Sequence, residues 1–262
     1  MRQMLKPLAV LLIAGFAITS CKKEVKDPVQ EQISQETLAK INDHGFGTSD
    51  VQKVEEGYLV EGDIILTEEF LNTRPGGNFL RIAETEQYRT TNLVDGPRVI
   101  TVSVSSQLPS SYIAATDEAL ARYNAQNLTL TFQRVSSGGN ISLVKGNGQF
   151  LASAGFPSSG GNPYGQVKVN SRAIGNQPQG TVATIIAHEI GHCIGFRHTD
   201  YMSRQYSCGG SPFNEGASSV GAVHIPGTPT GPDSGSWMLS CIGSGQNRPF
   251  NNNDRTALGY LY

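Results

Sequence analysis

The sequence predicts an α+β fold, and three observations predict it. Short segments of alternating apolar and polar residues, divided by glycine-rich loops, occur within residues 128–170 and indicate strands. A longer apolar segment, residues 181–193, has the spacing of a packed helix. The last residues, 251–262, start with Asn and Asp caps ahead of Ala257 and Leu258, which indicates a terminal helix.

The predicted elements follow one another in a simple order. Residues 99–104 alternate as a strand, and residues 109–126 form a helix because Ile113, Leu120 and Tyr123 recur at helical spacing. Four more strand segments follow, at residues 128–132, 141–144, 150–154 and 166–170. The helices at 181–193 and 251–262 complete the fold, and the sequence has no internal repeats.

Composition narrows the class of protein. A chain of 262 residues with 38% hydrophobic content is long enough for one large domain or two small ones. A net charge of −2 without a long Lys/Arg run gives no electrostatic reason to expect a nucleic acid partner. Thirty glycines and only 16% charged residues are typical of a loop-rich extracellular protein. We expect a monomer.

The amino terminus has the pattern of a signal peptide. Arg2 and Lys6 precede an apolar run at residues 8–18, which is too short to span a bilayer core of about 30 Å. The residues that end in Cys21 resemble a bacterial lipobox, which implies cleavage after residue 20 and a lipid anchor on Cys21. The alternative is an ordinary signal with an incidental cysteine. The resemblance implies an outward-facing lipoprotein of the cell envelope, held at the outer membrane or cell surface.

The remainder of the chain divides into three parts. Residues 21–35 are charged and polar with Pro28, which suits a solvated tether. Residues 36–90 form a small acidic segment, and residues 91–262 contain the predicted strands and helices.

Three of the five histidines fall within one short string, His188-Glu-Ile-Gly-His-Cys-Ile-Gly-Phe-Arg-His198. On a helix His188 and His192 face the same side, so both imidazoles can bind one zinc ion at about 2.0–2.1 Å. Glu189 is next to the first ligand and is placed to accept a proton from a water molecule at the metal.

His198 joins this site only if the helix stops before it. A continued helix would place His198 about 15 Å along the axis from His188. Gly195 supplies the stop, because glycine adopts a left-handed conformation without steric cost. The alternative, surface or core histidines without a metal, is weak: this extended pattern arises by chance on the order of once in a hundred thousand chains of this length.

The extended pattern and a later methionine resemble the metzincin zinc peptidases. Met238 follows the third histidine after a long Gly/Pro-rich loop, where metzincins have the Met-turn below the metal; taken alone, a methionine is more often a flexible core residue. The resemblance implies that residues 91–262 are a catalytic domain with a twisted mixed sheet, an active-site helix, a Met-turn and a C-terminal helix. The string His-Glu-Ile-Gly-His is similar to that of the dual-action HEIGH metallopeptidases.

This resemblance implies an endopeptidase with one catalytic zinc that acts on proteins or peptides. Zinc would polarise the scissile carbonyl, Glu189 would take the proton of the water and pass it to the leaving amine, and substrate would add as a strand beside residues 150–154. A non-catalytic zinc-binding surface module and a metal-dependent amidase are the two alternatives. Glu189 disfavours the first, because a structural zinc site needs no base.

Two positions near the site depart from related families. Astacin-like and serralysin-like metzincins have a tyrosine two residues after the Met-turn methionine, where this chain has Ser240, so we expect three histidines plus water. Thr199 and Asp200 follow the third histidine, at the place where astacins have Glu. Asp200 either orients His198 or the following loop, or is a solvated loop acid.

Residues 60–63, Val-Glu-Gly-Asp, resemble the F-x-G-D segment of astacin pro-regions, with Val60 in place of the aromatic. The resemblance implies that Asp63 fills the fourth metal position and that residues 36–90 are a pro-segment. The alternative is a Gly-Asp turn between strands. Arg81, Arg89 and Arg98 are candidate cleavage points, and cleavage would also free the catalytic domain from the membrane.

With Cys21 lipidated, Cys193, Cys208 and Cys241 remain, so at most one internal disulfide forms. Cys208–Cys241 would brace the loop of the Met-turn, but Cys193 can pair with either, and the sequence does not choose. The Gly/Asn-rich loops offer oxygen ligands for calcium, but no calcium-loop spacing supports such a site.

Overall fold

The computed structural model describes residues 33–44, 46–73, 87–214, 222–229 and 232–262. The predicted signal peptide, Cys21 and Arg81 lie outside these residues. Within the described part, no helix is both long enough and apolar enough to span a membrane.

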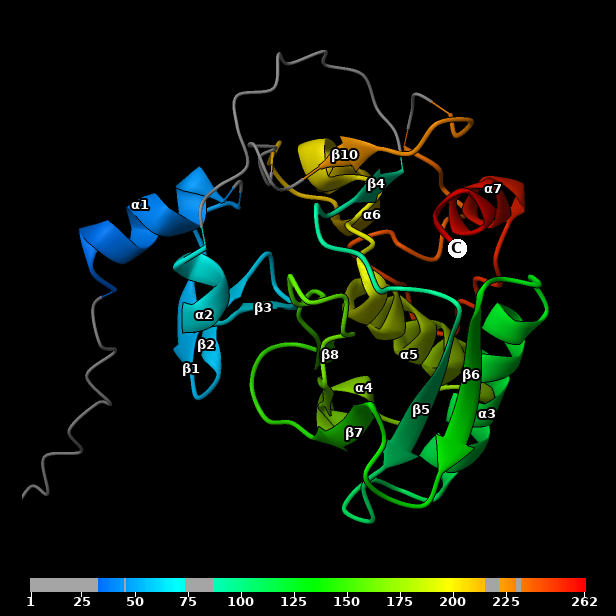
Figure 1. Cartoon of the computed structure of the whole chain (residues 1–262). Helices are drawn as coiled ribbons and strands as arrows, with labels where there is room; N and C mark the ends of the chain where they lie inside the picture. The colour runs from blue at the N-terminus through cyan, green and yellow to red at the C-terminus, as the bar shows by residue number, and fades with distance from the viewer. Residues whose placement is uncertain (1–32, 45, 74–86, 215–221, 230–231) are drawn as a thin grey trace, which may run out of the picture. The chain divides into compact units, whose positions relative to one another are not determined.

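A five-stranded sheet is the centre of the fold (Figure 1). Its strand order is β6-β5-β7-β9-β8, and the pairs among the first four strands are parallel, whereas β8 is antiparallel to β9. The strands are β5 (Arg98–Val104), β6 (Leu130–Val135), β7 (Ile141–Lys145), β8 (Ala152–Ser153) and β9 (Gln166–Val169). The predicted mixed sheet is therefore confirmed.

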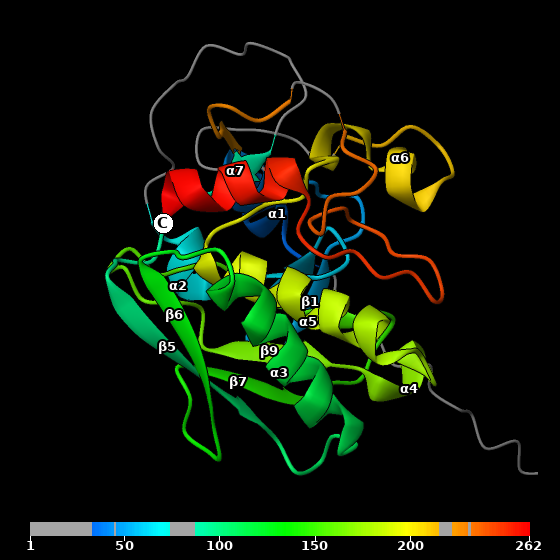
Figure 2. The ribbon, with the colours of Figure 1, turned by 90° about the vertical axis from the view of Figure 1, so that its right-hand side faces the viewer.

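Two helices pack against each other over this sheet: α3 (Ser111–Asn124) and α5 (Gln179–Ile194) (Figure 2). In α5, every residue from Thr181 to Ile194 is buried, including the polar side chains of the predicted metal site. The short helix α4 (Ser171–Ile174) precedes α5. The helix and strand types predicted for residues 99–194 are confirmed, with ends that differ by a few residues.

The strand predicted at residues 150–154 is shorter than expected. Only β8 pairs with β9, through Ala152 opposite Val169 and Ser153 opposite Lys168. Ala154 instead forms an isolated parallel bridge with Ile64. This strand is the edge of the sheet, and residues 63–65 pair with the chain directly after it.

Residues 33–44 and 46–73, hereafter the leading segment, contain two short helices and three strands. The elements are α1 (Gln35–Asp43), β1 (Gln52–Val54), β2 (Gly57–Val60), β3 (Ile64–Leu66) and α2 (Glu68–Leu71). The three strands are antiparallel in the order β1-β2-β3. Their buried side chains form an apolar cluster with Phe156 of the sequence that follows the sheet edge, so the leading segment is packed onto the rest of the chain.

Three more elements, α7, β4 and β10, are described next, because contacts among them connect residues 87–89 with the C-terminal part of the chain. The helix α7 (Asn252–Leu261) begins with a capping box between Asn251 and Asp254, which confirms the predicted terminal helix. The strand β4 (Tyr88–Arg89) pairs with β10 (Val223–His224). The side chain of Gln87 donates to Asp254 Oδ1 at 2.6 Å. Residues 87–89 are therefore bound to the C-terminal half of the chain.

A 3₁₀ turn (Tyr201–Ser203) and α6 (Gln205–Cys208) lie between the third histidine and the Met-turn. Cys208 forms a disulfide with Cys241, and Cys193 is free and buried. This settles the pairing that the sequence left open. Burial raises the pKa of the Cys193 thiol well above its usual value, so this thiol stays protonated and unreactive.

Candidate metal centre

The three histidines of the motif converge on one point. Side-chain ligand atoms of His188, His192, His198 and Asp63 all lie within 4.8 Å of one another, and all four residues are buried. The ring centroids of His188 and His192 are 4.6 Å apart, as expected for successive turns of α5. His198 lies 4.9 Å from His192 and 5.2 Å from His188, measured between ring centroids.

The turn at Gly195 brings His198 back to the helix. Gly195 ends α5 with φ = 114°, a left-handed conformation, and its N–H bonds to the Gly191 and His192 carbonyl oxygens. A Cβ at Gly195 would lie 3.0 Å from the carbonyl oxygen of Asn92, so a side chain is excluded by space as well as by conformation. The predicted role of Gly195 is confirmed.

Backbone carbonyl groups orient the two helical histidines. Nδ1 of His188 donates to the Trp237 oxygen at 2.9 Å, and Nδ1 of His192 donates to the Phe196 oxygen at 2.8 Å. Because a carbonyl only accepts, each ring carries its proton on Nδ1, and the Nε2 lone pairs face the centre of the cluster. Neither Nε2 has a hydrogen-bond partner among the described residues. Buried imidazole nitrogens of this kind fit a zinc ion.

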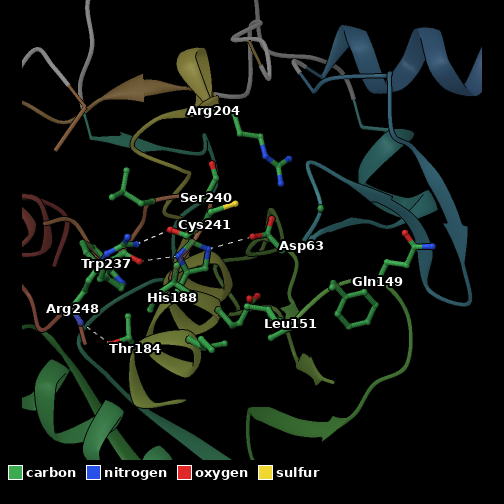
Figure 3. A pocket seen from close by; sticks show the side chains of 17 residues that line it. Asp63, Gln149, Leu151, Thr184, His188, Arg204, Trp237, Ser240, Cys241 and Arg248 are labelled. Atoms are coloured by element: carbon green, nitrogen blue, oxygen red, sulfur yellow. Dashed lines mark hydrogen bonds and ion pairs between the residues drawn. The ribbon is translucent and has the colours of Figure 1, made fainter. Parts of the chain in front are cut away.

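Asp63 is the fourth donor of the cluster, and Figure 3 shows it beside His188. Its Oδ2 lies 3.1 Å from Nε2 of His198 and 3.5 Å from Nε2 of His188. Burial by itself raises the pKa of this carboxyl, but His198, His188 and His192 together outweigh burial and lower the pKa well below its usual range. Asp63 is therefore a carboxylate. Asp63 lies in the turn between β2 and β3 and also in the metal cluster. The two alternatives given by the sequence therefore do not exclude each other.

Glu189 is buried beside this cluster. Burial, and next the nearby charge of Asp63, raise the pKa of Glu189 well above its usual value. Its Oε2 has no hydrogen-bond partner in the described part of the chain. A carboxyl group with a raised pKa and an unused oxygen is suited to accept and return a proton near neutral pH.

Met238 lies in close contact with α5 at Gly191. It is fully buried, and its carbonyl oxygen accepts the N–H of Thr199, next to His198. A Cβ built on Gly191 would lie 2.6 Å from the Met238 sulfur, so the glycine of the His-Glu-Ile-Gly-His string makes room for the methionine. Sequence reasoning missed this role, although a glycine inside a buried helix is a signal of close packing.

Asp200 ties the loop after His198 to the chain beyond Met238. It is buried, and its Oδ1 accepts two hydrogen bonds of 2.9 Å from the N–H and hydroxyl of Ser240. Its Oδ2 accepts from the Ser207 hydroxyl at 2.6 Å. The solvated loop acid is therefore the wrong alternative, and Ser240 binds Asp200.

A cavity of about 230 Å³ opens beside the cluster (Figure 3). It is bounded by Asp63, His188 and Glu189 on one side and by the β8 edge on another. Leu151, Ile185, Leu239 and Ile242 contribute apolar wall, and the Cys208–Cys241 disulfide supports the wall at Cys241. A cavity of this kind can accept a substrate side chain.

The chain matches the family model of the dual-action HEIGH metallo-peptidases over residues 59–262. The chain belongs to this family. The match begins at Leu59, so it includes the turn that carries Asp63. No curated protein matches the sequence.

Solved structures with partial similarity include two of myroilysin, at 15% identity, with TM-scores of 0.41 and 0.42. Each covers 66% of this chain, and 82% and 86% of the respective myroilysin chain. A hatching enzyme zinc-protease, high choriolytic enzyme 1 from Oryzias latipes (Medaka fish), is 20% identical over 62% of this chain and 88% of its own, with a TM-score of 0.41.

As a HEIGH metallopeptidase, the chain is a zinc-dependent peptidase whose substrates are proteins or peptides. The three histidines and Asp63 fit the expected zinc ion. When bound, zinc supplies Lewis acid chemistry that polarises a carbonyl and lowers the pKa of water. The chain supplies oriented imidazoles, the Glu189 carboxyl group as the predicted proton acceptor, and a cavity beside both.

Some contributors had no signal in the sequence. The carbonyl groups of Trp237 and Phe196 orient the histidines through backbone geometry, which residue type does not reveal. Glu61 of the leading segment forms a buried ion pair at 2.7 Å with Arg197. Arg197 lies in residues 195–200, the loop after α5 that carries His198, hereafter the metal loop. Glu61 and Arg197 are 136 positions apart, so no local pattern connects them.

Proposed function

We propose that this chain is a zinc endopeptidase made as a latent, lipid-anchored precursor, in which Asp63 takes the fourth zinc position. The observation that carries the proposal is the placement of Asp63 Oδ2 at 3.1 Å from His198 Nε2. Carboxylate oxygen is a competent zinc ligand at about 2.0–2.2 Å, so Asp63 would exclude the water that catalysis requires.

The leading segment also occupies the edge of the sheet. The N–H of Ala154 donates to the backbone oxygen of Asp63 at 2.8 Å, and the N–H of Ile65 donates to the backbone oxygen of Ala154 at 2.7 Å. These are the backbone groups beside which we predicted that substrate adds as a strand. The segment therefore blocks a substrate as well as a water molecule.

Three protein forms test latency. These are the intact chain, the chain cut after folding at a protease site inserted within residues 74–86, and intact Asp63→Ala. We expect zinc-dependent cleavage of unfolded protein by the cut chain, partial activity of intact Asp63→Ala, and little activity of the intact wild type. Cut Glu189→Ala and cut wild type with chelator are the inactive controls.

Two outcomes would contradict the proposal. Equal activity of the intact and cut wild type would refute latency while leaving the peptidase in place. No chelator-sensitive cleavage by any form would leave a non-catalytic zinc module as the better account.

We place the activating cut between residues 73 and 87, which leaves Arg81 among the three predicted cleavage points. Arg89 lies in β4, and its backbone is paired with Val223 and bridged to Phe196. Arg98 is the first residue of β5, and its guanidinium donates to Gly161 and Asn162. A cut at either arginine would remove residues that are bonded to the rest of the fold.

The proposed lipid anchor makes the cut visible by fractionation. With lipid on Cys21, the intact chain would sediment with membranes and the peptidase would become soluble after the cut. Cys21→Ser is the matched variant, expected in the soluble fraction throughout. Sedimentation of Cys21→Ser equal to that of the wild type would refute the lipid anchor.

A further inference from the structure

A second carboxylate of the leading segment is buried beside the metal loop. Nη2 of Arg197 lies 2.7 Å from both Oε1 and Oε2 of Glu61, and both side chains are fully buried. Arg197 directly precedes the ligand His198, and Glu61 precedes Asp63 by two residues. The leading segment thus places one carboxylate on the metal cluster and another on the adjacent guanidinium.

Two aromatic rings lie close to the guanidinium of Arg197. Its guanidinium carbon lies 4.6 Å from the ring centroid of Phe46 and 5.4 Å from that of Tyr201. Phe46 belongs to the leading segment, whereas Tyr201 follows the metal loop. Aromatic faces of this kind hold a guanidinium in one orientation while its donors stay available for a carboxylate.

Arg204 adds a second guanidinium at the same place. Its Nη1 donates to the backbone oxygen of Glu61 at 2.6 Å, and the residue lies in the wall of the cavity beside the metal cluster (Figure 3). Glu61 and Gly62 have positive φ values of 54° and 90°, and this turn lets residue 61 reach Arg197 while residue 63 reaches the metal cluster.

Removal of the leading segment takes the Glu61 carboxylate and the Phe46 ring away from Arg197. The guanidinium then lacks the buried carboxylate that compensated its charge, and its residue directly precedes the third metal ligand. Guanidinium and carboxylate form short, charge-assisted hydrogen bonds, and these are strongest where water is excluded.

We propose that Arg197, supported by Arg204, is a specificity site for an acidic side chain of the peptide substrate. Glu61 occupies this site in the precursor, and a substrate Glu or Asp occupies it in the active enzyme. The inference rests on the proposed function. Because Glu61 and Asp63 are two residues apart, the acidic substrate residue lies about two positions from the residue at the metal, rather than next to the scissile bond.

The test compares matched peptides with the cut chain. One peptide without acidic residues is varied by a single Glu, or by a single Gln, at each position on both sides of the cleaved bond. For the wild type we expect one position at which Glu raises kcat/KM over Gln by about tenfold, mainly through KM. The ratio should fall to about one in Arg197→Gln and should persist in Arg134→Gln, an exposed arginine remote from the cleft.

Folding is controlled by a double variant. Arg197→Gln alone leaves Glu61 buried without its partner in the precursor, which can prevent folding. Glu61→Gln with Arg197→Gln makes both groups neutral, and the Glu/Gln ratio is then measured after the cut. Wild-type cleavage without preference for Glu at any position would refute the specificity site and leave the peptidase intact.

A binding measurement tests the site without turnover. A peptide of residues 57–66 and its Glu61→Gln counterpart are titrated into cut Glu189→Ala from which the leading segment has been washed. We expect about tenfold weaker binding of the Gln peptide, and no difference between the two peptides in the double variant. Equal affinities in the Arg197 form would overturn the inference, whether or not the wild type cleaves peptides.

Discussion

Gly191 in α5 shows how the absence of a Cβ can help to position a metal site. Gly191 lets the Met238 sulfur approach α5, and the preceding residue, Trp237, accepts a hydrogen bond from His188 Nδ1 through its backbone oxygen. The Met-turn could be predicted from the sequence by resemblance, but its dependence on Gly191 could not, because it arises from a contact between residues far apart in the chain.

We predict that Gly191→Ala weakens zinc binding. Alanine favours a helix over glycine by about 0.5–1 kcal/mol, but here the new Cβ would overlap the sulfur, and overpacking costs about 1–3 kcal/mol. Competition with a zinc chelator should show weaker affinity for the metal. Gly259→Ala, in α7 with open space around it, is the matched control. Unchanged zinc affinity in Gly191→Ala would show that the methionine can move without effect.

At the scale of elements, alternation and helical spacing located most of the sheet and the main helices, but not their ends. The predicted strand at 150–154 is shorter because its first residues precede the pairing with β9 and its last one pairs with the leading segment. Which segment a sheet edge pairs with depends on the tertiary fold, and local sequence does not contain it.

The cap of α7 gives the protein a pH-dependent stability. Burial raises the pKa of Asp254 to about 6, although hydrogen bonds from Asn251, Gln87 and Trp237 oppose the increase. The folded state therefore holds this proton more tightly than the unfolded state, so stability decreases as the pH rises from about 4 to about 6.

We predict that Asp254→Asn removes this part of the pH dependence. Between pH 4 and pH 7 the unfolding free energy of the wild type should fall by up to about 3 kcal/mol relative to that of the variant. Urea titrations of both proteins at several pH values measure the difference, in which other titrating groups cancel. A difference that does not change with pH would show that Asp254 titrates normally.

At the scale of the whole molecule, the described residues of the acidic segment predicted at 36–90 pack onto the rest of the chain. Its strands β2 and β3 put Asp63 into the metal cluster and Glu61 onto Arg197. The resemblance to astacin pro-regions predicted the first contact from four residues. The second required the folded chain, because Arg197 reads as an ordinary residue between a phenylalanine and a ligand.

We predict that the Cys208–Cys241 disulfide contributes to the stability of the whole fold. Its loop spans 33 residues, for which the chain-entropy relation gives about 3–4 kcal/mol. Replacing both cysteines by serine should lower the denaturant midpoint accordingly, and Cys193→Ala alone serves as the comparison for a change of one buried thiol. A midpoint equal to that of the wild type would show that the Asp200 and Ser207 contacts hold this loop without the crosslink.

Under the proposed latency, the contacts of the leading segment would also determine how fast a cut chain becomes active. After the backbone is cut between residues 73 and 87, the segment is still bound by the edge pairing at Ala154, the Glu61–Arg197 ion pair and Asp63. Cutting then converts an intramolecular contact into a complex of two chains, and activity appears at the dissociation rate of that complex. We therefore expect a delay between cleavage and activity, and an inhibited fraction that grows with total protein concentration.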